Sequence, residues 1–161
     1  MKKIIFFVLI CQTVLFHINL AIAGELKVTA GNLNENSNYK KAYFAGGCFW
    51  CMEESFDKVE GIIQSISGYS GGHLKNPTYK EVIYKDTGHV ETIEITYDPK
   101  MISYKKLLEV FWKNIDPFDQ YGQFCDKGKS YRSVIFYKSN SQKKVIQKSI
   151  AEIEQRFNSK V

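Results

Sequence analysis

Cysteine is scarce in this chain, and so is any strong excess of one charge: the 161 residues include four cysteines and carry a formal net charge of +5. Cys11 lies in an apolar N-terminal stretch, which leaves Cys48, Cys51 and Cys125 in the rest of the chain. An odd number of cysteines does not close into a disulfide framework and leaves a thiol free to react. The mild positive charge is spread along the chain, so we expect no nucleic-acid partner.

No internal repeat or long low-complexity segment interrupts the sequence, and its length suits one domain with a full core. Residues 1–23 have the form of a cleavable secretory signal peptide: a basic start, an apolar stretch and small residues at 21–23. Three polar residues inside the stretch weaken the alternative of a membrane anchor, namely Gln12, His17 and Asn19. We therefore expect an exported protein, in the bacterial periplasm, with a polar linker at 24–38 and one domain at 39–161.

The most informative stretch runs from Gly46 to Glu54, with the sequence GGCFWCMEE. Two glycines allow a sharp turn, and the apolar spacing that follows predicts a helix with Cys48 in its first turn, facing inward. Unpaired N–H groups and the helix dipole favour a thiolate there, so Cys48 is the candidate nucleophile. Cys51 lies one turn further on the same side and is able to meet Cys48. A pair of buried structural cysteines, or a plain disulfide, is the alternative.

The remaining pattern alternates between strands and helices. We expect strands at 39–45, 62–67, 89–97 and 131–138, and helices at 48–59, at 78–84 with Thr78 as its cap, at 102–115, and after a cap at Ser141. The last helix has an inward stripe that ends at Phe157, and residues 116–130 are expected to be irregular. Residues 73–88 form a long connection of the kind that is usually functional or disordered.

This order predicts the fold class. A β-α-β-loop-β-α-β-α chain fits a ferredoxin-like split β-α-β core, an α+β two-layer sandwich in which helices pack on an antiparallel or mixed sheet. The start of the first helix, the long connection and the loop before the fourth strand then converge at one end of the sheet.

One acidic residue stands out on the strand at 89–97. Alternation places Glu91 with Ile93, Ile95 and Tyr97, whereas Glu94 points to the more polar side. A carboxyl group on the apolar side has its pKa raised by desolvation, which suits it to donate a proton near neutral pH. An exposed position at the strand end, where the choice of face means little, is the alternative.

Two other functions use the same cysteines. A general thiol–disulfide oxidoreductase also places a C-x-x-C pair at a helix start, although the order of strands is not that of a thioredoxin. A metal site would use the three cysteines with His73 or His89, but zinc ligands usually come in two pairs and only one pair is present. We expect no bound metal and no organic cofactor.

Five motifs in order resemble the peptide methionine sulfoxide reductases of type A: GGCFW at 46–50, GYSGG at 68–72, NPTY at 76–79, TGHVE at 87–91 and YRS at 131–133. The resemblance implies that Cys48 is the nucleophile and that Phe49 and Trp50 line a pocket for the methyl group of the substrate. It also implies that Glu91, Tyr79 and Tyr131 hold the sulfoxide oxygen, with Asp126 in support. The family reduces the S epimer of methionine sulfoxide, free or in proteins, and repairs oxidised proteins.

The resemblance further implies a sulfenic acid on Cys48, then an intramolecular disulfide, which an external thioredoxin-like dithiol reduces. Two positions depart from the common pattern: Cys51 stands where many members have glycine, and Cys125 where many have asparagine. We expect Cys51 to resolve Cys48, with Cys125 as a possible relay. Many members also continue beyond the last helix, so the domain is expected to be short at its C-terminal end, and we expect a monomer.

Overall fold

The computed structural model describes residues 38–161. The signal peptide expected at 1–23 and nearly all of the linker expected at 24–38 lie outside the described residues. The elements follow the order β1 (Lys40–Ala45), α1 (Phe49–Asp57), β2 (Ile62–Ser70), α2 (Tyr79–Tyr84), β3 (Val90–Tyr97), α3 (Tyr104–Lys113), β4 (Gly122–Gln123), β5 (Asp126–Lys127), a 3-10 helix η1 (Lys129–Tyr131), β6 (Val134–Phe136) and α4 (Asn140–Phe157).

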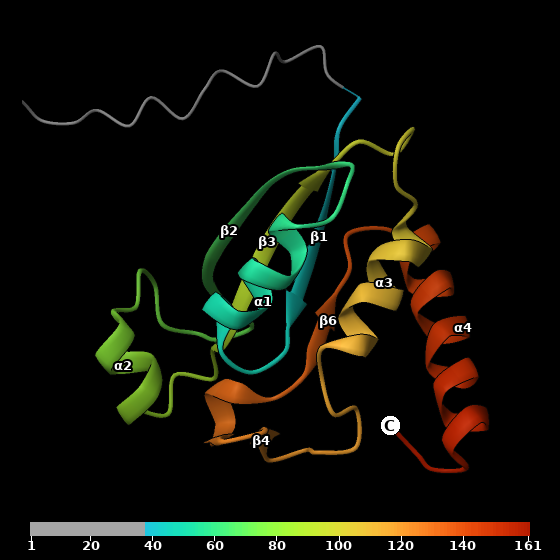
Figure 1. Ribbon diagram of the computed structural model, residues 1–161. Helices are drawn as coiled ribbons and strands as arrows, with labels where there is room; N and C mark the ends of the chain where they lie inside the picture. The colour runs from blue at the N-terminus through green and yellow to red at the C-terminus, as the bar shows by residue number, and fades with distance from the viewer. Residues whose placement is uncertain (1–37) are drawn as a thin grey trace, which may run out of the picture. The chain divides into compact units, whose positions relative to one another are not determined.

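The main sheet has the strand order β2-β3-β1-β6, with every neighbouring pair antiparallel (Figure 1). β3 therefore lies between β1 and β2, which α1 connects, and β1 lies between β3 and β6, which the segment containing α3 connects. These are two interlocked split β-α-β units. The predicted α+β sandwich with a ferredoxin-like core is confirmed.

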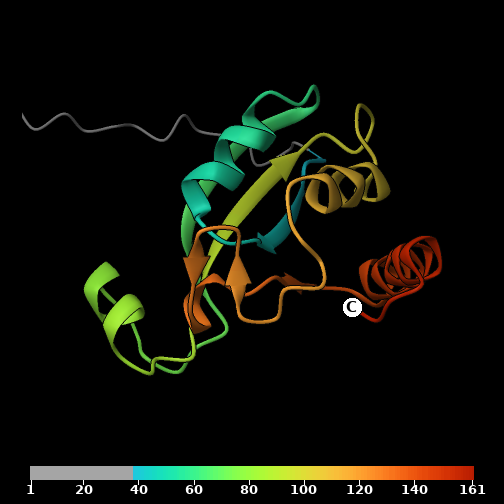
Figure 2. The same cartoon turned by 60° about the horizontal axis from the view of Figure 1, so that its bottom comes forward.

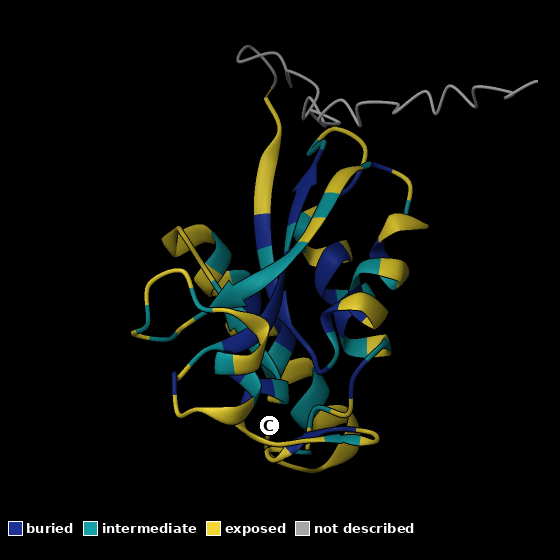
Figure 3. Ribbon diagram, turned by 90° about the vertical axis from the view of Figure 1, so that its left-hand side faces the viewer, coloured by how far each residue is buried: buried dark blue, intermediate teal, exposed yellow. Residues whose placement is uncertain are grey.

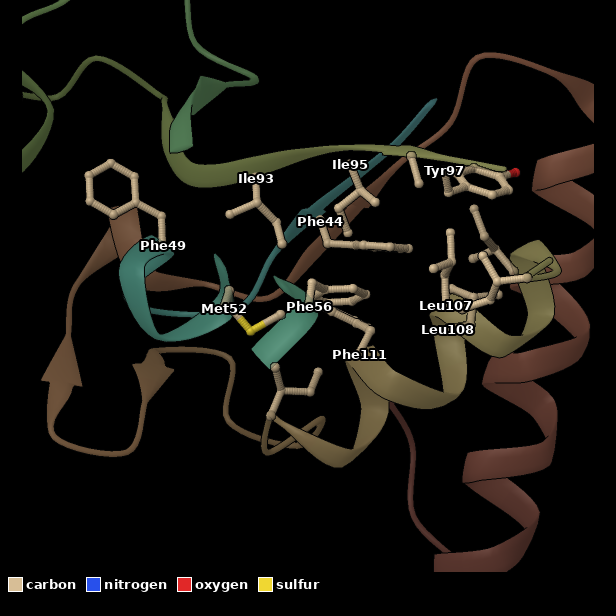
Figure 4. Close-up of a cluster of buried hydrophobic side chains, with 14 residues drawn as sticks. Phe44, Phe49, Met52, Phe56, Ile93, Ile95, Tyr97, Leu107, Leu108 and Phe111 are labelled. Carbon is tan, nitrogen blue, oxygen red and sulfur yellow. The ribbon is translucent and has the colours of Figure 1, made fainter. Parts of the chain in front are cut away.

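Helices α1 and α3 cover one face of this sheet, and aromatic side chains fill the space between the layers (Figure 4). The ring of Phe44 on β1 stacks on Phe56 of α1 at 5.5 Å and on Phe111 of α3 at 5.1 Å between centroids. All three side chains are buried, and each contributes about 1.5–3 kcal/mol by leaving water. Figure 3 shows that buried residues gather along the middle of the sheet, where β3 is the most enclosed strand.

Three segments meet at one end of the sheet, as the order of elements predicts. The start of α1, the excursion that carries α2 and the small β4–β5 hairpin all lie there (Figures 1 and 2). The excursion leaves β2 after Ser70 and returns to β3 at Val90. The candidate functional residues of the sequence are carried by these three segments, by η1 and by β3.

Several sequence-based boundaries were wrong. β2 continues to Ser70 instead of ending at 67, and the region expected to be irregular contains the β4–β5 hairpin and η1. The last strand is shorter than 131–138, because Tyr131 belongs to η1. The last helix is capped by Ser139, whose hydroxyl accepts the N–H of Gln142, and not by Ser141; Phe157 on it is exposed. Of the helices between residues 38 and 161, none is both long and apolar enough to cross a membrane.

Candidate active site

The glycine pair before α1, Gly46 and Gly47, is closely packed by neighbouring side chains. Gly47 has φ of +84°, in the region that favours glycine, and a Cβ atom there would lie 2.7 Å from the Cβ of Gln123 in the β4–β5 hairpin. A Cβ on Gly46 would lie equally close to Ile115, just beyond the end of α3. The turn therefore holds the start of α1 tightly between the hairpin and α3.

Cys48 is the N-cap residue of α1, one position before the first turn that the sequence predicted. Its carbonyl accepts the N–H of Met52 at 3.2 Å, and the residue is half-buried. An N-cap side chain lies beside the N–H groups at the start of the helix that have no partner within it. The thiol of Cys48 lies at this position but makes no capping hydrogen bond to these groups.

One of those N–H groups binds the acidic residue singled out from the sequence. The backbone N–H of Phe49 donates to the Glu91 carboxylate, with 3.0 Å between N and Oε2. Glu91 is 2 % exposed and shares its face of β3 with Ile93 and Ile95 of the core. Burial raises the pKa of Glu91 above its ordinary value; the Phe49 N–H opposes this shift and the charge of Asp126 adds to it.

Phenol groups surround this carboxyl group. Tyr79 begins α2 and Tyr131 ends η1, yet their hydroxyls lie close enough to interact. Burial raises the pKa of Tyr131 well above its ordinary value, helped by the hydrogen bond with Tyr79 and by the negative charge of Glu91. The Tyr131 phenol therefore keeps its proton and can act as a hydrogen-bond donor.

Aromatic rings form the wall next to Cys48. The ring of Phe49 is buried and lies 5.3 Å from that of Trp50, measured between centroids. Trp50 is 65 % exposed and stacks on Tyr79, with 6.5 Å between centroids and 12° between planes. Of the two residues that the resemblance assigned to a methyl pocket, Phe49 is thus a buried ring at the base of the wall. Trp50 is an exposed ring at its rim and joins α1 to α2.

Tyr69 belongs to the same group, although the sequence analysis did not select it. It lies directly opposite Glu91 in the β2–β3 pairing, and its ring is 5.7 Å from that of Phe49. Burial raises its pKa, as do the nearby charge of Glu91 and the Tyr79 hydroxyl. Alternation gives no clear signal for it, because Tyr69 shares its face of β2 with Ser65 and Ser67, whereas the apolar Ile66 on the other face is exposed.

The second cysteine does not lie on the inward side as predicted. Cys51 is exposed, and the residue that α1 buries at this point is Met52. Cys51 nevertheless lines the same cavity as Cys48. The neighbouring Cys48 thiol is the main cause that raises the pKa of Cys51, followed by partial burial and by the charges of Asp126 and Glu54.

The third cysteine occupies a tight turn where the sequence suggested a mobile loop. Phe124 and Cys125 form the two-residue connection between β4 and β5, with φ of +49° at Phe124, and Cys125 is exposed. Asp126, opposite Gln123 in the hairpin, acts electrostatically on Glu91, Cys51 and Tyr131. The hairpin thus brings Asp126 to the site and leaves Cys125 on the surface.

A cavity of about 270 Å³ opens beside the two neighbouring thiols. Cys48, Cys51, Gln123 and Asp126 are among its lining residues. Gln123 is a second residue that the sequence analysis missed. Its buried amide accepts the N–H of Asp116 at 2.6 Å and donates to the same residue's carbonyl at 2.8 Å, which fixes the hairpin to the end of the α3 segment. A two-residue strand gives no periodic signal from which this role could have been found.

The histidines considered as metal ligands serve elsewhere or face solvent. His89 binds backbone groups with both ring nitrogens, and His73 is exposed. Between residues 38 and 161, no three His, Cys, Asp or Glu side chains are grouped so that they could hold a metal ion. The described residues therefore give no support to the zinc alternative.

Comparison with known proteins identifies a family whose name agrees with the resemblance seen in the sequence. The family model described as "Peptide methionine sulfoxide reductase" matches residues 40–161. A curated relative from Listeria monocytogenes serotype 4b, named peptide methionine sulfoxide reductase MsrA, is 56% identical over 115 residues, which cover 71% of this chain and 65% of that protein. The chain thus spans slightly less than two thirds of the length of the curated relatives that it matches.

Solved structures agree in fold. Reduced Mxr1 from Saccharomyces cerevisiae is 30% identical, with a TM-score of 0.72 over 76% of this chain and 72% of that one. The same yeast protein in complex with Trx2 matches with a TM-score of 0.55 at 22% identity, over 76% of this chain and 71% of that one. The family match covers the sheet, both core helices and every residue of the thiol site, and the chain belongs to the peptide methionine sulfoxide reductase family.

Proposed function

We propose that this chain reduces the S epimer of methionine sulfoxide, free or within proteins, to methionine, with Cys48 as the nucleophile. The observation that carries the proposal is the hydrogen bond from Phe49 N–H to the buried Glu91 carboxyl group. The bond places Glu91, whose pKa is raised, beside Phe49, the residue that follows Cys48. The rings of Phe49 and Trp50 form the aromatic wall at this point. A sulfoxide needs this combination, because its sulfur becomes electrophilic only when its oxygen is protonated or hydrogen bonded.

The first step forms a sulfenic acid. The Cys48 thiolate attacks the sulfoxide sulfur while Glu91 gives its proton to the oxygen, and the phenols of Tyr79 and Tyr131 donate hydrogen bonds to that oxygen. The S–O bond of the substrate breaks, the hydroxyl group passes to the Cys48 sulfur, and methionine leaves as a thioether. Two electrons pass from the Cys48 sulfur to the sulfur of methionine.

The second step forms a disulfide. Cys51 attacks the sulfenic sulfur, an S–S bond forms to Cys48, and the hydroxyl group leaves as water. The position of Cys51 on the same cavity as Cys48 supports Cys51 in this role. An external dithiol of the thioredoxin class then attacks the disulfide and regenerates both thiols while it becomes oxidised itself. The complex of yeast Mxr1 with Trx2 supports a reductant of this kind.

We also propose that the protein works outside the cytoplasm, on the basis of the sequence pattern at residues 1–23. Disulfides persist in such compartments, so the enzyme then needs a dedicated donor that receives electrons across the membrane. The intact mass of protein isolated from the exported fraction tests the proposal. A mass that corresponds to cleavage after Ala23 supports it, and uncleaved protein confined to the cytoplasm contradicts it.

The activity is tested with purified full-length protein, dithiothreitol and the separate epimers of methionine sulfoxide. Reduction of the S epimer alone, and its loss in Cys48→Ser, is the expected result. Insulin reduction faster than sulfoxide reduction would instead favour a general thiol–disulfide oxidoreductase, the alternative that the exposed Cys51 beside Cys48 allows. The matched control is Cys125→Ser, because that thiol lies on the surface turn of the hairpin.

A further inference from the structure

Two motifs of the sequence, at 68–72 and 87–91, meet at the base of the excursion that carries α2. The backbone N–H of His73 donates to the carbonyl of Thr87 at 3.0 Å, which joins the outgoing and returning chains. Gly72 packs flat against the imidazole: a Cβ there would lie 2.3 Å from Cδ2 of His89 and 2.5 Å from the Thr87 carbonyl oxygen. No side chain fits at Gly72 while His89 keeps this position.

The ring of His89 completes this junction with both of its nitrogens. Nδ1 accepts the backbone N–H of Gly72 at 3.3 Å, and Nε2 lies 2.8 Å from the carbonyl oxygen of Leu74. A carbonyl oxygen only accepts, so Nε2 is the donor in this contact, while Nδ1 is the acceptor in the other. One side chain at the start of β3 thus binds two points on the outgoing chain, Gly72 and Leu74.

What the junction holds in place is Tyr79. The excursion beyond it contains a single turn-and-a-half helix, α2, whose own order comes from the capping box of Thr78 and Glu81. Its links to the rest of the domain include the stacking of Tyr79 on Trp50, the buried side chain of Val82 and an exposed ion pair between Asp86 and Lys129. An exposed ion pair contributes little. The position of the Tyr79 hydroxyl therefore depends on how the base of the excursion is fixed.

We propose that His89 is a positioning residue for the reaction: its two hydrogen bonds to Gly72 and Leu74 fix the excursion so that Tyr79 keeps its place against Trp50 at the site. This inference rests on the proposed function for its effect on turnover, but the fixing of the excursion is independent of it. The ring of His89 binds Gly72 and Leu74 of the excursion, so it acts through Tyr79.

The structural half is tested without any activity. Hydrogen exchange of peptides that span 72–88 is compared between the wild type and His89→Leu, which removes both hydrogen bonds. Exchange in this segment rises on the order of 10-fold while peptides of β1 and β3 stay protected. His73→Asn is the matched control, since His73 contributes its backbone to the junction and its side chain is exposed. Unchanged exchange in folded His89→Leu overturns the proposal.

The functional half is tested by coupling to Tyr79. His89→Leu lowers kcat for the S epimer on the order of 10-fold with little change in KM, because Tyr79 acts on the oxygen as the S–O bond breaks. In a Tyr79→Phe background the same substitution has less than about a twofold effect. His89→Asn and His89→Gln, which keep the shape to reach Gly72 and Leu74 respectively, recover part of the loss and remain informative if the leucine variant does not fold.

One result of these double-variant experiments would contradict the assignment to Tyr79. A loss that persists in Tyr79→Phe but disappears in Glu91→Gln means that His89 acts through β3 on the carboxyl group, and the assignment to Tyr79 is then wrong. Absence of sulfoxide reduction by the wild type would contradict the proposed function, whereas the exchange result would still decide whether His89 fixes the excursion.

Discussion

The Glu91 carboxyl group and the backbone N–H of Phe49 are joined by a hydrogen bond of 3.0 Å between β3 and the start of α1. This bond connects the middle of the sheet to the residue after the candidate nucleophile. It orients one carboxylate oxygen, Oε2, on the start of the helix. Burial keeps the pKa of this group above its ordinary value despite the bond.

If Glu91 donates the proton, Glu91→Gln keeps the shape of the side chain but removes the acid. We expect turnover to fall by roughly 10²–10⁴-fold, the usual scale for general acid catalysis, with little change in KM. Steady-state kinetics on the S epimer measures both. Glu94→Gln is the matched control, because Glu94 lies on the other face of β3 and pairs with Lys41. Equal rates for Glu91→Gln and the wild type would leave Glu91 without a catalytic role.

The pH dependence of the activity also tests whether Glu91 donates the proton, and the direction of the expected shift is fixed. Glu91 donates only when protonated, so activity is present below its pKa and is lost as the pH rises through it. After burial, the charge of Asp126 is what raises this pKa further. Asp126→Asn should therefore move the basic limb of kcat/KM to lower pH, while Asp119→Asn, whose partner is Lys127, should leave it in place. A shift to higher pH in Asp126→Asn would contradict this electrostatic role.

Most of the fold and part of the site could be predicted from the sequence. Long, strongly patterned segments such as 89–97 and 102–115 gave the right elements, and their order gave the split β-α-β topology. The face of Glu91 also followed from alternation, because a strand buried on one side by apolar neighbours cannot slip by one residue without exposing them.

The missed features depend on tertiary contacts. Gly68 suggested a break, yet pairing with β3 carries β2 through to Ser70 and brings Tyr69 opposite Glu91. The β4–β5 hairpin has strands of two residues and a positive φ at Phe124, which no residue preference indicated. Cys51 was assigned inward by helical spacing, but Met52 takes the buried position and Cys51 is exposed.

The choice between the two other cysteines can be decided by peptide mapping. After one equivalent of sulfoxide without reductant, we expect a Cys48–Cys51 link that persists in Cys125→Ser, because Cys51 lines the same cavity as Cys48. Cys125 sits on the exposed turn of the hairpin. Sulfenic acid that accumulates in Cys125→Ser, with Cys51 still free, would show that Cys125 resolves the enzyme directly.

The glycine turn can be tested through stability. Gly47→Ala forces a Cβ against Gln123 and keeps φ at +84°, so we expect the free energy of unfolding to fall by about 2–4 kcal/mol. Urea denaturation followed by circular dichroism measures it. Gly68→Ala is the matched control, since a Cβ there has no atom within 4 Å, and its stability should be unchanged or slightly higher. Equal stability of both variants would mean that the turn is not held as described.

The most direct measurement is a single turnover without reductant. Reduced full-length protein is mixed with an excess of the S or the R epimer, and the methionine released and the thiols remaining are counted. We expect about one methionine per chain from the S epimer, none from the R epimer, and the loss of two thiols, those of Cys48 and Cys51. Release of methionine from neither epimer by folded protein, or undiminished release in Cys48→Ser, would contradict reduction at Cys48.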